Sequence, residues 1–320
     1  MNARAVWGLL TSRLVRVAIA VGLLAFLLTR IDLVATLGTL RRISPWLLAA
    51  QLAAFYAVQA LVSLRWKWLL KLNGISISWW RAMRLNFLGL FTSCFLPGSV
   101  GGDAVKIAVL AREGHGAGRT ITAVVLDRLI NTTVVTLCAC AMLPRILGLV
   151  KFARPALPAH GLLWGGMLAV VGAGGLILML RLLPVLARRG IIPTGAWERI
   201  ARARDELLAW RDHPLVFAKA VLITFGMLLI ATAAAYLLLV GLHAPIRYVD
   251  YLSVFFAMHF VNMLPISING LGVTEVSLVV LLGTLGVDRE TAAGFAILSR
   301  ALYYLAVAPG ACIGFRPKGE

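Results

Sequence analysis

Residues 95–106 read FLPGSVGGDAVK and lie inside an otherwise apolar region of the chain, residues 83–111. Proline and glycine in the middle of a membrane leave backbone N–H and C=O groups that lipid cannot hydrogen-bond. Non-helical backbone at that depth is tolerated only where it is buried in protein or lines a cavity that holds water. We therefore predict a re-entrant hairpin in this region, with half a helix in, a break, and half a helix out.

The composition of the 320-residue chain supports insertion into a membrane. Hydrophobic residues make up 61% and charged residues 14% of the chain, and the mean hydropathy is +0.91. Soluble domains are nearer to about a quarter charged. A membrane-spanning helix needs about 20 mostly apolar residues. The predicted full spans are residues 14–29, 46–64, 120–143, 161–183, 215–241 and 291–313.

A second apolar region, residues 251–286, carries a similar interruption, LPISINGLGVTE, at residues 264–275. This interruption and the first one share the pattern Leu-Pro-x-Ser-aliphatic-x-Gly, which starts at Leu96 and again at Leu264. Paired apolar segments broken by Gly and Pro at corresponding positions of two halves are typical of transporters built from inverted repeats. We therefore predict a second re-entrant hairpin here.

An acidic residue follows each break, and an arginine lies further along in the next apolar run. Asp103 precedes Arg128 by 25 residues, and Glu275 precedes Arg300 by the same number. Three predicted full spans separate the hairpins, and an odd number of crossings gives the two halves opposite orientations. The predicted fold is an all-α polytopic membrane protein with about six full transmembrane helices and two re-entrant helical hairpins arranged as an inverted repeat.

The whole chain, residues 1–320, is predicted to form a single integral membrane domain. We expect the first repeat over residues 83–143 and the second over residues 251–313. The one sizeable polar segment lies between them, at residues 184–213, and has apolar residues at helical spacing. This pattern favours either a cytoplasmic amphipathic helix on the inner leaflet or a solvated linker helix.

The chain carries a net charge of +18, and its basic residues gather between the apolar runs. If the N-terminus is cytoplasmic and both hairpins return to the side they entered, 21 Lys and Arg residues lie on the cytoplasmic side and 8 on the outer side. This bias follows the positive-inside rule. It predicts a multi-pass protein of the cell inner (plasma) membrane with both termini in the cytoplasm, and it leaves no reason to expect nucleic acid as a partner.

Arg128 and Arg300 are each expected deep in a span, where an arginine costs about 2.5–3.5 kcal/mol on insertion scales. Each arginine therefore needs a partner. An ion pair with Asp103 or Asp127 would satisfy Arg128, and one with Glu275 would satisfy Arg300. Asp127 is expected to orient Arg128, and proton exchange at Asp127 is a second possibility. Because a planar guanidinium also matches phosphate, the acids would hold the arginines until an anionic headgroup binds.

The breaks themselves are candidate anion-binding elements. If each break precedes a half-helix, its free N–H groups and positive dipole end point into the protein interior. Glycine there lets the backbone approach a ligand, or else only permits tight helix packing. Asp103 and Lys106 are three residues apart and can pair on one helix face. The candidate substrate-binding residues are Pro97, Gly98, Ser99, Gly101, Gly102, Asp103, Lys106, Asp127, Arg128, Asn269, Gly270, Gly272, Glu275 and Arg300.

The sequence holds none of the motifs that mark common enzyme and pump classes. It has no Walker A, G-x-S-x-G, H-E-x-x-H or dinucleotide-binding pattern. Its four cysteines lie in apolar stretches without the spacing of a zinc site. We therefore expect no cofactor, no metal and no catalytic residue, and an ATP-driven pump within this chain is disfavoured.

Taken in order, the motifs LPGSVGGDAVK, VVLDR, NGLGVTE and LSR resemble the lysylphosphatidylglycerol synthase transmembrane family, also called the flippase-like domain family. The resemblance covers nearly the whole chain. It implies a membrane domain that moves an aminoacylated or otherwise modified phospholipid between leaflets. Except for Ser99, the candidate residues given above match family motif positions. The full synthases add a soluble domain that transfers lysine from tRNA, and we expect no such activity because the chain stops soon after its last span.

The leading hypothesis is a lipid flippase for an anionic or modified phospholipid or a related lipid. A membrane-embedded transferase acting on polyprenyl or phospholipid substrates, with Asp103 or Asp127 as the base, is an alternative. An accessory subunit for a separate lipid-synthesis enzyme, in polyprenyl-phosphate, hopanoid or aminoacyl-lipid metabolism, is another. A secondary transporter of a soluble anion is a fourth. The expected partner is a membrane phospholipid or polyprenyl lipid, and the oligomeric state stays open.

Overall fold

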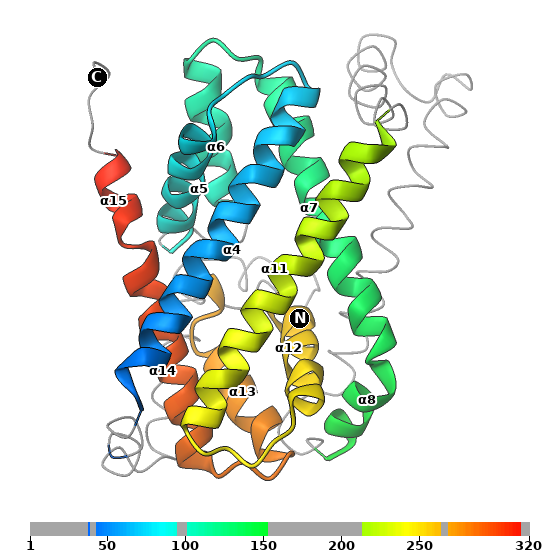
Figure 1. The fold of residues 1–320 in the computed structure, drawn as a ribbon, viewed down its shortest axis with the longest axis vertical. Coiled ribbons are helices and arrows are strands. Elements are labelled where there is room, and N and C mark those ends of the chain that lie inside the picture. The colour runs from blue at the N-terminus through cyan, green and yellow to red at the C-terminus, as the bar shows by residue number, and fades with distance from the viewer. Residues whose placement is uncertain (1–37, 39–42, 95–100, 153–212, 264–267, 315–320) are drawn as a thin grey trace, which may run out of the picture.

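The computed structural model describes residue 38 and residues 43–94, 101–152, 213–263 and 268–314 (Figure 1). Within these ranges every regular element is a helix. The predicted spans 14–29 and 161–183, and all of the polar segment 184–213 except its last residue, lie outside the described residues.

Four stretches of the described chain are long and apolar enough to cross a membrane. They are α4 (Pro45–Leu72), α7 (Ala117–Ala141), α11 (Pro214–Gly241), and α14 (Arg289–Val307) with its continuation α15 (Pro309–Gly314). Both α4 and α11 contain 28 residues. At about 1.5 Å per residue each is about 42 Å long, which exceeds a hydrocarbon core of about 30 Å.

These helices confirm that the predicted spans 46–64, 120–143, 215–241 and 291–313 are helical. The clearest difference is at α4, which continues to Leu72. The helix ends there because Gly74 adopts a left-handed conformation with φ of +75°. The N–H groups of Gly74 and Ile75 then bond back to the carbonyls of Lys71 and Leu70, at 3.0 and 2.9 Å. This pattern is a Schellman motif, which satisfies the last carbonyls of a helix.

The first predicted hairpin region, residues 83–111, contains two antiparallel helices, α5 (Trp79–Ser93) and α6 (Gly101–Arg112). The two helices pack side by side (Figure 1). The residues between them, 95–100, lie outside the described part of the chain. The structure therefore confirms a helix before the first motif and a helix that begins within it.

Two glycines allow close contact between α5 and α6. A Cβ atom on Gly102, at the start of α6, would collide with the Gly89 carbonyl and the Ser93 hydroxyl near the end of α5. At the other end of the pair, the Arg81 guanidinium on α5 bonds to the Glu113 carboxylate just after α6. These contacts show that the hairpin is antiparallel and that glycine at position 102 serves packing.

The second predicted hairpin region, residues 251–286, contains α12 (Tyr248–Met263), the 3₁₀ turn η2 (Ile268–Gly270) and α13 (Val273–Gly283). Residues 264–267 lie outside the described part of the chain. In the described part of the break the α-helix is interrupted by this short 3₁₀ turn, in which Asn269 has non-helical backbone angles.

Three residues of this second break have left-handed backbone conformations. Asn269, Gly270 and Gly272 have φ values of +50°, +69° and +80°. Glycine adopts this region freely, and asparagine is one of the few other residues that tolerate it. The left-handed backbone of the break therefore explains why the motif has asparagine or glycine at these three positions.

The two hairpins enter the helix bundle from opposite ends. In Figure 1, α5 and α6 lie in the upper half, beside the upper parts of α4 and α7. The α12–α13 pair lies in the lower half, where α12 also contacts α8 (Leu143–Phe152). This arrangement is the one expected for two halves of opposite orientation.

Each hairpin has its own hydrophobic core. The first core joins α4, α5, α6 and α7 through residues such as Trp66, Leu69, Leu85, Leu110 and Ala123. The second core is larger and joins α12, α13 and α14 through residues such as Tyr251, Val254, Leu281, Leu282 and Phe295. Burial of these side chains holds each hairpin against its neighbouring long helices.

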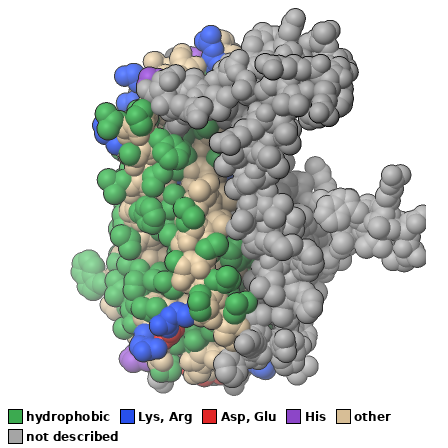
Figure 2. All heavy atoms as spheres, turned by 90° about the vertical axis from the view of Figure 1, so that its right-hand side faces the viewer, with side chains coloured by type: hydrophobic (Ala, Val, Ile, Leu, Met, Phe, Trp, Pro, Cys, Tyr) green, Lys and Arg blue, Asp and Glu red, His purple; other side chains and the backbone are tan. Residues whose placement is uncertain are grey.

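The outer surface of the long helices is apolar. Large hydrophobic side chains are exposed along α4, α7, α11 and α14, among them Trp46, Leu137, Leu222, Leu229 and Leu305. Figure 2 shows such side chains over most of the described part of one face, with Lys and Arg near its two ends. An apolar patch of this extent on a soluble monomer would be unusual, whereas lipid covers it at no cost.

Candidate functional site

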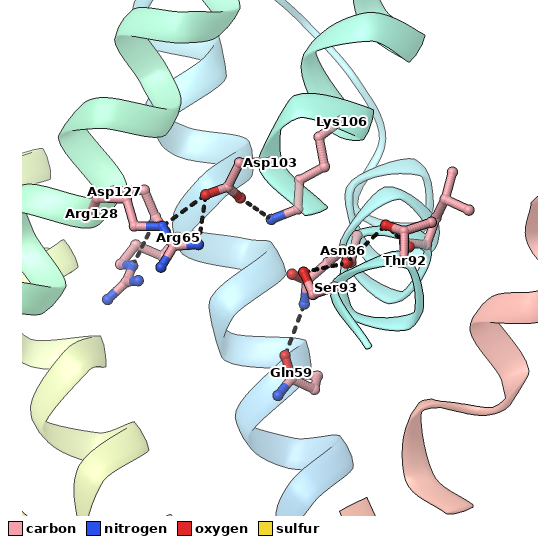
Figure 3. Close-up of polar contacts among 11 residues, drawn as sticks. Gln59, Arg65, Asn86, Thr92, Ser93, Asp103, Lys106, Asp127 and Arg128 are labelled. Atoms are coloured by element: carbon pink, nitrogen blue, oxygen red, sulfur yellow. Dashed lines mark hydrogen bonds and ion pairs between the residues drawn. The ribbon is translucent and has the colours of Figure 1, made fainter. Parts of the chain in front are cut away.

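The first acid–arginine pair forms between α6 and α7. Asp103 Oδ2 accepts hydrogen bonds from Arg128 Nε at 2.8 Å and Nη2 at 2.6 Å. Asp103 Oδ1 lies 3.1 Å from Lys106 Nζ, one turn further along α6. Figure 3 shows the carboxylate between the two cations. The structure thus confirms the predicted pairing of Asp103 with both Arg128 and Lys106.

This cluster has one carboxylate and two cations, so its formal charge is +1. Asp103 lies in the first turn of α6, where the helix dipole favours a negative charge. The Asp103 and Lys106 side chains are 8% and 14% exposed, while that of Arg128 is 53% exposed. Lys106 Nζ also lies 5.3 Å from the centre of the Trp66 ring, a cation–π contact. The Arg128 guanidinium is therefore the accessible cation of the cluster.

The second pair forms between α13 and α14. Glu275 Oε1 accepts a hydrogen bond from Arg300 Nε at 2.5 Å, and Glu275 Oε2 accepts one from the Gly272 N–H at 2.7 Å. Arg300 Nη1 donates in turn to the Asn269 carbonyl at 3.0 Å. The Glu275 and Arg300 side chains are 3% and 16% exposed. Both side chains of this pair therefore hydrogen-bond to the backbone of the second break and hold its conformation.

A third ion pair, which the sequence did not predict, joins three long helices. Arg65 on α4 donates from Nε to Asp127 Oδ1 at 2.8 Å, and from Nη1 to the Thr224 hydroxyl of α11 at 2.5 Å. The Arg65 side chain is only 2% exposed. Figure 3 shows Arg65 beside Asp127.

This pairing bears on the expected role of Asp127. The expected role of Asp127 in orienting Arg128 stays a prediction. The partner that the structure gives Asp127 is Arg65, which the sequence places on the cytoplasmic side because the predicted span ends at residue 64. Polar spacing gives no clear signal for this pair: Gln59 and Ser63 are also buried on α4, but Arg65 is two residues past Ser63 and points to another side of the helix.

The second break lies close to the end of α5. Asn269 Nδ2, in the second break, lies 3.9 Å from the sulfur of Cys94, the residue that follows α5. Further along, Gly310 of α15 lies against the Phe87 carbonyl and the Phe91 side chain of α5. Two elements of the second half therefore contact α5 of the first hairpin.

Of the predicted site residues, the structure groups Asp103, Lys106 and Arg128 in one cluster and Asn269, Gly272, Glu275 and Arg300 in another. Gly101 and Gly102 begin α6 beside the first cluster, and Gly270 lies within the second break. Pro97, Gly98 and Ser99 lie outside the described residues. Substrate contact by any of these residues stays a prediction.

Comparison of the chain with models of known protein families gives a match over most of its length. The family model described as "Lysylphosphatidylglycerol synthase TM region" matches residues 13–310. The chain belongs to this family. No curated protein matches the chain.

Membership of the lysylphosphatidylglycerol synthase TM family, together with the spanning helices, identifies a multi-pass membrane protein and is consistent with a lipid-related role in the membrane. Within the described residues, no group of three or more His, Cys, Asp and Glu side chains is placed to hold a metal ion. The Asp103 cluster, with one guanidinium and one ammonium group, has the chemistry to recognise an anion.

Proposed function

We propose that this protein is a flippase, which moves an anionic or modified phospholipid, or a related lipid, between the two leaflets of the cell inner membrane. The observation that supports this most is the pair of acid–arginine clusters beside two helical hairpins that enter from opposite ends. In transporters built from inverted repeats, broken helices of this kind line the substrate site near the middle of the membrane.

The proposed membrane placement makes both hairpins re-entrant and the two halves an inverted repeat. The upper end of the bundle in Figure 1 would face the cytoplasm, because basic residues gather there at the helix ends: Lys71, Arg81, Arg84, Arg112 and Arg119. At the lower end, Arg145 and Arg247 are both paired with Asp250. Both termini would then be cytoplasmic.

The proposed headgroup site is the Asp103–Lys106–Arg128 cluster. Its formal charge of +1 attracts a phosphate, and the Arg128 side chain, which is 53% exposed, is the part of the cluster that a headgroup can reach. The acyl chains would stay in the bilayer against the apolar helix surfaces. Rocking of one half against the other would then expose the headgroup to each leaflet in turn.

The test is a lipid-exchange assay on the full-length protein. Purified protein is reconstituted in phosphatidylcholine vesicles with phosphatidylglycerol that carries a fluorescent headgroup, and dithionite quenching reports the accessible fraction. We expect wild-type protein to raise the quenched fraction above that of empty vesicles. Arg128→Gln should slow exchange roughly 10- to 100-fold, as expected for loss of a charged hydrogen bond of about 1.5–3 kcal/mol.

The matched control is Arg145→Gln, since Arg145 is as exposed as Arg128 but pairs with Asp250 at one end of the bundle. Exchange by this variant should equal that of the wild type. Undiminished exchange by a correctly folded Arg128→Gln protein would contradict the proposed site. Mass spectrometry of the recovered lipid separates translocation from transfer, because a covalently changed lipid would point to the transferase alternative.

A further inference from the structure

A cavity of about 380 Å³ lies between the two halves, apart from the three ion pairs. Helices α4, α7, α11, α12, α13 and α14 all contribute side chains to its wall. Neither Arg128 nor Arg300 is among its lining residues. The cavity is therefore distinct from the proposed phosphate site, although Asn131 on its wall is only three residues beyond Arg128, about 4.5 Å along α7.

The polar side chains of this wall are suited to hydroxyl groups. They are amides, hydroxyls and one imidazole, all able to donate and accept hydrogen bonds: Gln51, Asn131, His259, Asn262, Thr274 and Ser299. None of the described residues that line the cavity is Lys, Arg, Asp or Glu. A charged group entering here would lose its hydration without gaining a counter-charge, which is costly in a low-dielectric site.

Two residues of this wall each carry a buried polar atom without a partner. Gln51 Oε1 and His259 Nε2 make no hydrogen bond in the structure. Buried polar atoms are normally satisfied by protein, water or ligand, and an unsatisfied one costs about 1–3 kcal/mol. By contrast, the Thr274 hydroxyl donates to Asn262 Oδ1 at 2.9 Å, which fixes the orientation of one amide. A small turn of the Gln51 or His259 side chain toward the cavity would give a bound hydroxyl group a partner.

The rest of the wall is apolar and aromatic. Phe255, Phe295 and Tyr251 line the cavity beside aliphatic side chains. The C–H groups on the face of a sugar ring or polyol pack well against such surfaces, while the hydroxyl groups of the same molecule can hydrogen-bond to amide side chains. This mixture, a few polar groups on a mostly apolar wall, is the usual make-up of a small-molecule site.

We propose that this cavity binds the neutral, hydroxyl-bearing part of a lipid headgroup, a sugar or a polyol. The inference rests on the proposed function, because it takes the bound molecule to be a lipid. It adds a preference for one class of lipid headgroup. The phosphate would bind to the Arg128 cluster, and the hydroxyl-bearing part would bind in the cavity beside Asn131. Lipids with a hydroxyl-rich headgroup would then be preferred over lipids with phosphate alone.

The test is photo-crosslinking of the full-length protein in phosphatidylcholine nanodiscs. The probe is dodecyl glucoside with a diazirine at the chain carbon nearest the sugar, and labelled peptides are mapped by mass spectrometry. We expect saturable labelling of α12, with competition by unlabelled dodecyl glucoside. Competition by free glucose would support the same chemistry from a soluble source. Equal competition by dodecyl phosphate, or the absence of saturable labelling, would overturn the proposal.

Variants on one helix supply the matched comparison. Asn131→Leu removes a hydrogen-bonding group of the cavity and should weaken labelling roughly 3- to 10-fold, which corresponds to one neutral hydrogen bond. Thr133→Val, which faces a different and apolar pocket on the same helix, should label like wild type. His259→Leu is the second variant in case Asn131→Leu does not fold. Unchanged labelling of a folded cavity variant would refute the proposal.

This readout is binding at equilibrium, so the two ideas can fail separately. Wild-type labelling in a protein that exchanges no lipid would overturn only the proposed translocation. Exchange of labelled phosphatidylglycerol without saturable glucoside labelling would overturn only the assignment of this cavity.

Discussion

The α5–α6 hairpin with α7 and the α12–α13 hairpin with α14 share one plan but use their acids differently. In both, an arginine Nε donates to a carboxylate 25 residues earlier in the chain. In the first half, Asp103 holds two cations, one of them half exposed. In the second half, Glu275 and Arg300 bond to the backbone of their own break. The second pair is therefore a structural clamp, and the first cluster is the one to which we assign the proposed headgroup binding.

Formal charge distinguishes the halves in the same way. The Asp103 cluster carries +1, whereas the Glu275–Arg300 pair is neutral and almost fully buried. A buried pair with all its hydrogen bonds made is costly to break and has little attraction for a further anion. The predictions below test this division, beginning with the largest expected effect.

Removal of the clamp acid should cause the largest loss of stability. Glu275→Ala leaves Arg300 buried without its counter-charge and frees the Gly272 N–H, so we expect a loss of about 3–5 kcal/mol. Asp103→Ala should cost less, about 1–3 kcal/mol, because Arg128 can turn to water. Thermal unfolding of both variants in detergent measures the difference. Equal losses would contradict the division between clamp and binding cluster.

Arginine geometry should matter for exchange in the first half. Arg128→Lys keeps the charge but loses the planar fork, and we expect lipid exchange to fall roughly tenfold, about 1.4 kcal/mol, with little change in stability. Arg300→Lys should instead lower the unfolding temperature, because a single ammonium group does not reproduce the two separate nitrogens, Nε and Nη1, that donate to Glu275 and to the Asn269 carbonyl. The exchange assay and thermal unfolding, run on both variants, compare the two arginines. A loss of stability in Arg128→Lys, with slower exchange but unchanged stability in Arg300→Lys, would contradict the proposed roles of the two arginines.

The close contact in the first hairpin gives a packing prediction. Gly102→Ala places a methyl group against the Gly89 carbonyl, which should force α5 and α6 apart at a cost of about 1–3 kcal/mol. Gly226→Ala on α11 is the control, since a Cβ there has no atom within 4 Å. It should leave stability unchanged or raise it by about 0.5–1 kcal/mol. Similar unfolding temperatures for the two variants would refute the close-packing argument.

The smallest effect is expected at the ends of the bundle. Arg145 and Arg247 pair with Asp250, but their side chains are 50% and 81% exposed. Exposed ion pairs contribute about 0–1 kcal/mol. Arg145→Gln should therefore change the unfolding temperature little, and less still at high salt. If Arg145→Gln lowers stability as much as Glu275→Ala does, then burial does not determine how much each ion pair contributes to stability.

Local sequence signals were sufficient to predict the four described long helices and the helices on either side of each break. Apolar length marked the spans, and Gly and Pro marked the breaks. The need of a deep arginine for a partner predicted Glu275 for Arg300 and left Asp103 and Asp127 open for Arg128, which the structure pairs with Asp103. The left-handed Asn269 follows from the same motif, since few other residues tolerate that conformation.

The Arg65–Asp127 pair could not be predicted, for two physical reasons. Hydropathy cannot separate a buried arginine near a helix end from one in the headgroup region, so Arg65 was assigned to the cytoplasm. The partner also depends on how α4 and α11 pack on α7, and Thr224 joins the network from 159 residues away. Helical spacing gives the direction of a side chain but not the helix that it meets.

Gly310 has a consequence for motion. The last described helix of the second half, α15, lies against the backbone of α5 in the first hairpin. If one half rocks against the other, as proposed, α15 and α5 must either move together or slide past each other. A bulkier residue at position 310 would therefore disturb the proposed motion as well as the packing.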